Sequence, residues 1–441
     1  MAWHTALLLM LLPLCGFLAL GLPVAFTFFV VNIIGAMVFL GGEAGLAQMV
    51  RNSVTALTNY SLAPIPLFIL MGEILLHSGV AFRAIDAIEK LIAKVPGRLP
   101  IVSVCGGTVF AALSGSSLAN TAMLGSALLP DMLKRGYDPR LAMGPIMATG
   151  GIAMLIPPSA LAVLLGSLAG ISISKLLIAG IVPALIMAVL FVGYILAVCL
   201  IDPSRSPRDD SPQAVGWARY KPFVRDVLPL SLVFVAVIGS LVGGIATPTE
   251  SAALGCVAAA LAAIGYRSLT WKNLTISLRE TARVSVMTLF IIAASVTFSQ
   301  ILAFSGATDG LVDLVANSGL SPFGLVVGMV LILLFLGCFV DQVSMLMITI
   351  PLFIPLAQHA GIDLLWLGVL YLLTMEIGFL TPPFGLLLFV MKGVAPPHIR
   401  MTQVYAAVTP FALITLAVLG LIVAVPAVAT WLPDLIQGPT R

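Results

Sequence analysis

The sequence predicts an all-α polytopic membrane protein built from two related halves. Three observations support this expectation: the composition, the distribution of basic residues, and a repeat at an offset of about 225 residues. The 441-residue chain is 60% hydrophobic and 9% charged, with a mean hydropathy of +1.16. Soluble domains carry about 25% charged residues, so most of this chain is expected to face lipid or other apolar helices. The net charge of +3 gives no reason to expect a nucleic-acid partner.

Apolar stretches of bilayer length provide the predicted crossings. They lie near 5–22, 24–41, 61–78, 141–166, 176–200, 226–243, 248–266, 284–305, 364–390 and 404–432. Two further apolar stretches, 100–128 and 323–357, are interrupted by polar residues and are predicted to be re-entrant hairpins. The first stretch lacks a basic start and a small-residue cleavage site, so it is predicted to be a retained span.

The basic residues predict the orientation, because cytoplasmic loops attract Lys and Arg. If the chain starts outside and both interrupted stretches turn back, all 21 Lys and Arg except Arg51, Lys175 and Arg441 fall in cytoplasmic loops. A full crossing of either stretch would move basic residues outside. The distribution therefore favours two re-entrant hairpins and places both termini on the periplasmic side.

Two pairs of segments reveal an internal repeat. The segment "GYDPRLAMGPIMATGGIAMLIPPS" from Gly136 aligns with "GIDLLWLGVLYLLTMEIGFLTPPF" from Gly361, so that glycine–aspartate corners and Pro-Pro pairs coincide. Near the same offset, "MGEILLHSG" from Met71 meets "FSQILAFSG" from Phe298. Each half is expected to hold five crossings and one hairpin. Because five is odd, the second half enters from the opposite side, which is the inverted repeat of secondary transporters.

The predicted organisation is a first repeat at 1–200, a cytoplasmic linker at 201–225 and a second repeat at 226–441. The first repeat contains scaffold helices in 1–98, a hairpin at 100–128, a broken helix at 141–166 and a helix at 176–200. The second contains scaffold helices in 226–305, a hairpin at 323–357, a broken helix at 364–390 and a helix at 404–432. The family resemblance described below implies an elevator mechanism, in which the hairpins and broken helices move against the scaffold.

Hydrogen-bonding side chains cluster at the first predicted tip, in "LSGSSLANTA" from Leu113. A hairpin that ends inside the membrane exposes unpaired backbone groups, which cost several kcal/mol each in hydrocarbon. Such a tip must therefore line a cavity or meet partners. Its carbonyls and hydroxyls suit a hard monovalent cation, and half-helix N-termini suit an anionic substrate. The alternatives are that the hydroxyls only bond their own helix or that the small residues serve helix packing.

The matching segment of the second half is "GCFVDQVSM" from Gly337. Opposite each tip lies a Pro-broken helix, in "ATGGIAMLIPP" and "LTMEIGFLTPP", whose glycines and prolines free carbonyls. Each cation site is expected to join a tip to a broken helix. Asp341 is expected to carry a proton, contact the substrate or cap the next half-helix. Glu376, an ionisable group in a span, is a functional candidate, the alternative being a buried hydrogen-bonding partner.

The segment "GGIATPTESAALG" contains a glutamate that looks catalytic but fits a structural role. Thr247 and Glu250 form a predicted capping box around Pro248. The sequence contains no GxxxxGK[ST] phosphate loop, so ATP is not expected to drive the chain directly. The four histidines have no metal-ligand spacing, and no Ser–His spacing favours an intramembrane protease. We therefore expect no enzyme, no transition metal and no cofactor other than a coupling ion.

At these motifs the chain resembles the large membrane subunit of TRAP (tripartite ATP-independent periplasmic) transporters, in the ion-transporter superfamily. The matching segments include "PLFILMGEILLHSG", "SGSSLANTAMLGSALLPDMLKRGYDP", "DQVSMLMITIPLFIPLA" and "MEIGFLTPPFGLLLFV". The resemblance implies a sodium-driven elevator importer of the bacterial inner membrane. It also implies a small four-helix membrane subunit and a periplasmic binding protein that delivers an organic acid, such as a C4-dicarboxylate. The alternative is a stand-alone dicarboxylate or citrate symporter, coupled to sodium or protons.

The resemblance further implies two sodium sites at the tips. The first takes Ser114, Ser116, Ser117, Asn120, Gly150 and Gly151, and the second takes Gly337, Val340, Asp341, Thr374 and Thr381. The expected substrate contacts are Ser116, Thr121, Gln342, Ser344 and Glu376. Thr374 and Leu387 depart from the family, since many members carry Asn at both positions, and both residues are expected near the second tip.

Overall fold

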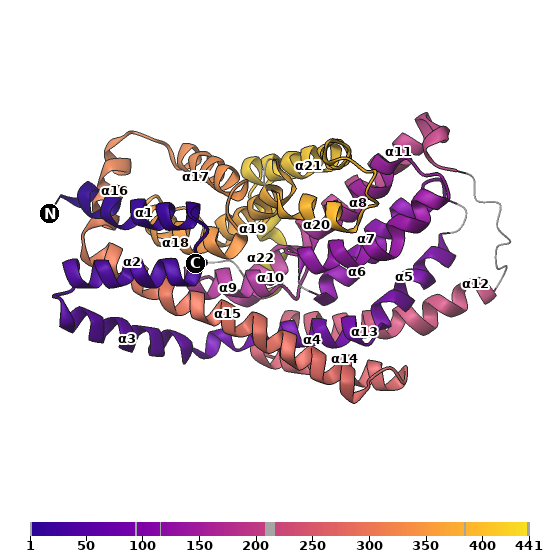
Figure 1. Ribbon diagram of the computed structural model, residues 1–441, viewed down its shortest axis with the longest axis horizontal. Coiled ribbons are helices and arrows are strands. Elements are labelled where there is room, and N and C mark those ends of the chain that lie inside the picture. Colours follow the sequence, from indigo (N-terminus) through magenta and orange to yellow (C-terminus); the bar gives the residue numbers. More distant parts are fainter. Residues whose placement is uncertain (1, 93–94, 115, 208–216, 383–384, 439–441) are drawn as a thin grey trace.

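The chain forms an elongated assembly of helices. The computed structural model describes residues 2–92, 95–114, 116–207, 217–382 and 385–438, and every regular element in them is helical. Most helices run along the long axis of the molecule (Figure 1). Among the described residues, seven helical segments are long and apolar enough to cross a bilayer, judged by length and composition. The all-α expectation is thus confirmed.

The first half begins with five helices before its hairpin. These are α1 (Trp3–Ala19), α2 (Val24–Phe39), α3 (Glu43–Leu57), α4 (Pro64–His77) and α5 (Val80–Leu91), with a 3₁₀ turn at Tyr60–Leu62. The hairpin pairs α6 (Arg98–Ser114) with α7 (Ser117–Lys134), and the broken helix is α8 (Pro139–Ile152) followed by α9 (Ala160–Ala169). The half ends with α10 (Ile173–Ala179) and α11 (Ile181–Ile201).

The second half repeats this order. After a 3₁₀ turn at Pro203–Arg205 come α12 (Trp217–Pro222), a π-helical turn at Phe223–Val227, α13 (Leu228–Val242), α14 (Pro248–Gly265), α15 (Trp271–Phe304) and α16 (Ala307–Asn317). The hairpin pairs α17 (Pro322–Gly337) with α18 (Gln342–His359). Then follow α19 (Leu364–Leu380), α20 (Leu386–Val394), α21 (Met401–Ala424) and α22 (Ala427–Gln437). Residues 208–216 of the predicted linker and 383–384 of the second predicted break lie outside the described residues.

One predicted helix was wrong. The predicted helix 404–432 is two helices, because the backbone leaves the helical region at Val425 and a new helix follows Pro426. The helix that contains the predicted span 284–305 begins earlier, at Trp271, where Thr270 caps it and accepts from the Asn273 N–H (3.2 Å). The helices α3, α5 and α16 were missed, because amphipathic helices lack the continuous apolar run on which the search for crossings depended.

The aligned sequence segments have matching local structure. Helix α4 ends at Ser78–Gly79 and α15 ends at Ser305–Gly306, with both glycines in the left-handed region at φ 70° and 71°. The two serine N–H groups donate to Ile74 and Ile301 (3.0 and 2.9 Å). Left-handed glycine at this position is a common helix end. In each half a short amphipathic helix, α5 or α16, follows directly.

The glycine–aspartate corners also match. Gly136 and Gly361 have φ of 85° and 67° and follow the second helix of each hairpin. Asp138 then caps α8 by accepting from the Arg140 N–H (2.7 Å), and Asp363 caps α19 by accepting from the Leu365 N–H (2.7 Å). The sequence repeat therefore encodes the same hairpin-to-helix turn twice.

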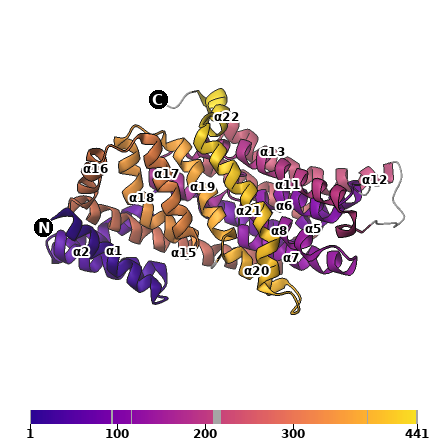
Figure 2. The ribbon, with the colours of Figure 1, turned by 90° about the horizontal axis from the view of Figure 1, so that it is seen from above.

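The two hairpins approach the centre of the molecule from opposite ends. Figure 1 shows α6 and α7 in the half that carries α12, and α17 and α18 in the half that carries the N-terminus. The first helix of each broken pair packs on its own hairpin, α8 on α6 and α7 and α19 on α17 and α18. A second group of helices, α2, α3, α4, α14 and α15, packs together along one side. Seen from above, α1 and α2 lie along one flank and α22 projects from the opposite one (Figure 2).

Basic segments that are distant in sequence meet at one end. The Arg83 guanidinium lies over the Tyr266 ring, 5.4 Å from its centroid, and the Tyr266 hydroxyl donates to the Arg225 carbonyl. Glu89 pairs with Arg98 (2.7 Å) and lies 3.6 Å from Arg135. Helix α5, the start of α6, the end of α7, the linker and the end of α14 therefore share one end of the molecule.

Candidate functional site

The first hairpin turns at the serine cluster. Helix α6 ends at Ser114, whose side chain is outside the described residues, and Ser116 starts α7. The extended backbone at Ser116 (φ −130°, ψ 114°) makes it the N-cap, and its hydroxyl accepts from the Ala119 N–H (3.3 Å). The tip therefore occurs where the sequence predicts it.

Both helices of this hairpin carry buried polar atoms without partners. The Asn120 side chain is completely buried, and neither its oxygen nor its nitrogen has a hydrogen-bond partner. The hydroxyls of Thr121 on α7 and Thr108 on α6 are also buried and unpaired. A Cβ added at Gly150 would lie 3.1 Å from the Thr121 hydroxyl, so this group faces the last turns of α8. A buried polar group without a partner costs about 1–3 kcal/mol, so these oxygens are candidates for a ligand.

The second tip satisfies its own polar groups. Asp341 is the N-cap of α18, and one carboxylate oxygen accepts from the N–H groups of Val343 and Ser344 (3.0 and 3.1 Å). The Ser344 hydroxyl donates to the other oxygen. The Val340 N–H donates to the Leu336 carbonyl (2.9 Å). Of the roles weighed for Asp341, the cap is the one that the geometry shows.

The second tip also contacts its broken helix through glycine. A Cβ at Gly378 would lie 2.5 Å from the Cα of Gly337, so the backbones of α17 and α19 touch here. The hydroxyls of Thr374 and Thr381 donate to carbonyls within α19, those of Leu370 and Ile377 (2.6 Å each). Each threonine oxygen keeps lone pairs that a cation could use.

Glu376 joins the two tips. Its side chain is completely buried, and Oε2 accepts from the Ser117 hydroxyl (3.0 Å) and the Gln342 amide (3.4 Å). Ser117 and Gln342 are the first residues of α7 and α18. A Cβ at Gly151 would lie 2.9 Å from the Glu376 Cγ, so α8 contacts it as well. One carboxyl group thus touches both hairpins and both broken helices.

The other predicted residues are divided between the two tips. Thr121 belongs to the first tip and Ser344 to the second, and Glu376 contacts both tips through Ser117 and Gln342. Thr247 and Glu250 form the predicted capping box at the exposed start of α14: the Thr247 N–H donates to the Glu250 carboxylate (2.7 Å). That structural prediction is confirmed.

Leu387, which is expected near the second tip, lies against α8 of the first half. This residue is completely buried, and a Cβ at Gly150 would lie 3.0 Å from its side chain. Helix α20 packs against α7 and α8, which carries Leu387 from the second half to the first tip. Thr108 and Met154 were not predicted. The Met154 sulfur accepts from the Gln342 amide (3.3 Å). A threonine and a methionine in apolar segments offer no sequence signal.

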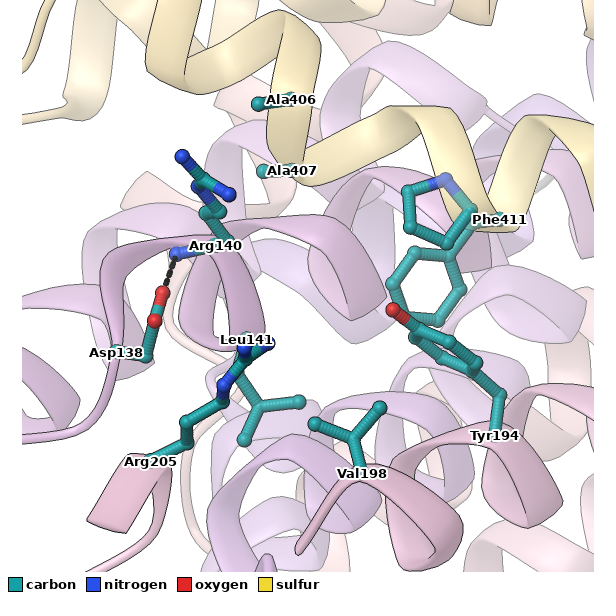
Figure 3. A pocket seen from close by; sticks show the side chains of 10 residues that line it. Asp138, Arg140, Leu141, Tyr194, Val198, Arg205, Ala406, Ala407 and Phe411 are labelled. Atoms are coloured by element: carbon teal, nitrogen blue, oxygen red, sulfur yellow. Dashed lines mark hydrogen bonds between the residues drawn. The ribbon is translucent and has the colours of Figure 1, made fainter. Parts of the chain in front are cut away.

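Two described cavities lie near the broken helices. One, of about 210 Å³, is lined by Thr381 and Pro382 beside α21. The other, of about 90 Å³, lies between α8, α11 and α21, and Arg140, Arg205 and Tyr194 surround it (Figure 3). This second cavity contains none of the predicted site residues. Beside it, hydrogen bonds from the Ser204 hydroxyl and from Arg205 hold the pKa of the Asp202 carboxyl below its usual value.

These features define a class of protein before any comparison. Seven apolar helical segments of bilayer length and two hairpins with buried polar residues at their tips are typical of a multi-pass membrane transporter. The sequence profile described as "Tripartite ATP-independent periplasmic transporter, DctM component" matches residues 11–428. The chain therefore belongs to this family of TRAP transporter large components.

Individual relatives are similar over their full length. The chain is 30% identical to the C4-dicarboxylate TRAP transporter large permease protein DctM of Vibrio cholerae, covering 98% of this chain and 99% of the relative. It is 30% identical to the ectoine TRAP transporter large permease protein TeaC of Halomonas elongata, covering 97% and 99%. It is also 30% identical to the 2,3-diketo-L-gulonate TRAP transporter large permease protein YiaN of Escherichia coli, covering 99% of both.

Solved structures share the fold at lower sequence identity. The YdaH transporter of Alcanivorax borkumensis superposes with a TM-score of 0.60 at 14% identity, covering 89% of this chain and 90% of that one. MtrF of Neisseria gonorrhoeae superposes with a TM-score of 0.58 at 16% identity, covering 87% and 84%. At these sequence identities, the two structures show only that the fold is shared.

Proposed function

We propose that this chain is the large permease subunit of a sodium-coupled importer of a small organic acid anion. It acts in the bacterial inner membrane with a small membrane subunit and a periplasmic binding protein. Family membership supports the transport role, and the names of the relatives include several carboxylate-bearing substrates. The observation that carries the sodium proposal is the pair of buried, unpaired oxygens of Asn120 and Thr121 just after the first tip.

Sodium at this position would supply what these oxygens lack. Amide, hydroxyl and carbonyl oxygens can replace the water shell of a monovalent cation. The break after Ile152 ends α8 beside them, so its last carbonyls offer further ligands. A second sodium is proposed at the other tip, where the Gly337–Gly378 contact brings the backbone of α17 to α19 and Val340, Thr374 and Thr381 provide oxygens.

The anion is proposed to bind between the tips. The 18-residue helices α7 and α18 begin there, and helix N-termini attract negative charge. Side chains at these two helix starts, those of Ser116, Thr121, Gln342 and Ser344, are the proposed contacts. Sodium would order the tips first and so complete this site.

The mechanism proposed is an elevator built on an inverted repeat. The matched caps and the approach of the hairpins from opposite ends support the repeat. The group α2, α3, α4, α14 and α15 would be the scaffold, while the hairpins and broken helices would move. The shared basic end would face the cytoplasm and both termini the periplasm. Each sodium that crosses with the membrane potential contributes about 2.3 kcal/mol per 100 mV.

A melting experiment tests the sodium proposal without a substrate. The chain, purified in detergent with its small membrane subunit, is melted across sodium concentrations at constant ionic strength, balanced with potassium or choline. Binding to the native state should raise the stability by about 2.7 kcal/mol at one hundred times the dissociation constant. Thr121→Ala should reduce the sodium-specific rise. The control variant Thr55→Ala, which removes an exposed hydroxyl from α3, should not reduce this rise. Absence of a sodium-specific rise in the wild type would contradict the proposal.

A second experiment tests the partners. Proteoliposomes that contain both membrane subunits are assayed for sodium-driven uptake of candidate organic acids with and without the binding protein. We expect uptake only with the binding protein. Full uptake in its absence would instead support the stand-alone symporter.

A further inference from the structure

The cavity between α8, α11 and α21 has no part in the proposed transport mechanism. It has a volume of about 90 Å³ and combines charged with apolar walls. Its basic side chains are Arg140, at the start of α8, and Arg205, in the turn that follows α11. Most of the remaining wall is apolar, formed by Leu141, Val198, Ala406, Ala407, Pro410 and Phe411. Such a lining suits a ligand that has both an anionic and an apolar part.

Three side chains at this cavity can donate further hydrogen bonds. The Arg140 guanidinium forms no ion pair with any described residue. The Nε of Arg205 pairs with the Asp202 carboxylate (2.9 Å), which leaves its two terminal nitrogens free to donate. The Tyr194 hydroxyl points into the cavity from the opposite wall (Figure 3) and has no hydrogen-bond partner among the described residues. An oxyanion in the cavity would therefore meet donors on two sides, and bonds to a charged acceptor are the strong ones.

One acid also lines the cavity, and it holds the site together. Asp138 caps α8 by accepting from the Arg140 N–H (2.7 Å), and its own N–H donates to the Arg205 carbonyl (3.1 Å). These contacts join the start of α8 to the turn after α11, so both arginines are held at the same cavity. The charged lining consists of two arginines and one aspartate, which gives it a net charge of +1.

The cavity lies where lipid headgroups end and acyl chains begin. Arg205 lies four residues beyond the segment Ile173–Ile201, which is long and apolar enough to span a bilayer. Tyr194 lies seven residues before the end of that segment, about 10 Å further along the helix. The arginines are therefore at the membrane surface, while Tyr194 and Phe411 are deeper. Basic pockets between transmembrane helices are typical sites for anionic lipid headgroups.

We propose that this cavity binds the headgroup phosphate of an anionic phospholipid, with Arg140, Arg205 and Tyr194 as its donors. The glycerol and the first acyl carbons of the lipid cover the apolar wall that α21 provides. A dissolved phosphate would leave that wall in contact with water, and a zwitterionic lipid would leave the positive charge of the lining uncompensated. The proposal goes beyond the proposed function, because it requires neither sodium nor a transported substrate.

The test is a lipid titration of the chain purified in detergent with its small membrane subunit. Melting temperatures are measured as phosphatidylglycerol is added at constant detergent, sodium and ionic strength, with phosphatidylcholine and potassium phosphate in parallel arms. A ligand that binds the native state raises the melting temperature with its concentration. We expect phosphatidylglycerol to give the largest rise. No rise with phosphatidylglycerol, or an equal rise with phosphatidylcholine, would overturn the proposal. An equal rise with potassium phosphate would identify a site for dissolved phosphate and overturn the lipid assignment.

Variants of the donors locate the response. Arg140→Gln should raise the phosphatidylglycerol concentration for half of the effect by about tenfold, because a hydrogen bond to a charged group is lost. Tyr194→Phe keeps the ring that packs edge-on against Phe411 and should raise that concentration by about fivefold. The control Arg279→Gln removes an exposed arginine from α15 and should follow the wild type.

Two results with these variants would contradict the site. A response in Arg279→Gln that is weakened as much as in Arg140→Gln would show that the lipid acts through the overall surface charge. Wild-type responses in both Arg140→Gln and Tyr194→Phe would place the lipid elsewhere on the protein. Because Tyr194→Phe leaves every charge and ion pair in place, it keeps the test decisive where the arginine variant folds poorly.

Discussion

The two hairpin tips occupy equivalent places in the two halves but satisfy their polar groups in opposite ways. At the second tip, Asp341 receives three hydrogen bonds from the turn that it caps. At the first tip, Asn120 and Thr121 are buried with no partner for any side-chain polar atom. The second tip thus pairs its acid within its own turn, whereas the first tip leaves the side-chain polar atoms of two residues unpaired. If sodium binds as proposed, the first tip should depend on it more strongly than the second.

The two tips also differ in how their glycines contact the neighbouring broken helix. At the second tip, backbone meets backbone at Gly337 and Gly378. At the first break, Gly151 meets a side chain, that of Glu376. A backbone contact yields less than a side-chain contact, so the second tip is the more rigidly fitted of the two.

The largest effect is expected from Gly378→Ala. Its new Cβ would lie 2.5 Å from the Gly337 Cα, and backbone cannot move aside without shifting α17. Overpacking of this kind costs about 1–3 kcal/mol, seen as a lower melting temperature and reduced uptake. Gly151→Ala should cost less, because it meets only a side chain. Equal losses in the two variants would remove the distinction between a more and a less rigidly fitted tip.

The next effect concerns the unpaired amide. In sodium-free buffer, Asn120→Ala should change the melting temperature little, because it removes a buried group whose hydrogen bonds are unmade. In the wild type, sodium at one hundred times its dissociation constant should add about 2.7 kcal/mol of stability, and the variant should lose most of this gain. The measurement is the difference between the melting temperatures with and without sodium, compared between the wild type and the variant. A large loss of stability in sodium-free buffer would show that Asn120 has a partner within the protein.

A smaller effect is expected from the cap of the second tip. Asp341→Ala should destabilise the chain by about 1–2 kcal/mol, the ordinary value of an N-cap, and should leave most of the sodium response intact. Asp138→Ala removes the cap of α8 and is the matched reference. If Asp341→Ala abolishes the sodium response while Asp138→Ala does not, the carboxylate is an ion ligand and the tips are more alike than their hydrogen bonds indicate.

Much of this comparison could be predicted from the sequence, since it depends on local rules. Serine and aspartate at helix starts and glycine at helix ends located both tips and both hairpin-to-helix turns within a residue or two. Because Gly136 aligns with Gly361 in the sequence repeat, a turn predicted in one half was also predicted in the other. The assignment of Asp341 to a cap, and the unpaired state of Asn120, required coordinates, because both depend on which partners lie within reach.

Other features were not predictable from a single sequence. Leu387 reaches the first tip only because α20 packs across the halves. Helix α5 was missed because Ala84, Ile85 and Ile88 are buried while Arg83 and Lys90 on the same short helix are exposed. Such a helix has too few apolar residues for a crossing, and its role depends on what it packs against.

The smallest effect is expected at a cap outside the tips. Thr247→Ala removes half of the capping box at the exposed start of α14, where water can replace the lost hydrogen bond, so it should cost at most about 1 kcal/mol. Ser116→Ala removes a cap of the same chemistry at the half-buried first tip, and should cost more. Melting curves of the two variants, with and without sodium, measure the difference. Only Ser116→Ala should alter the sodium response, because a cap at the tip positions the oxygens that are proposed to hold the ion, whereas a cap at the surface positions only its own helix.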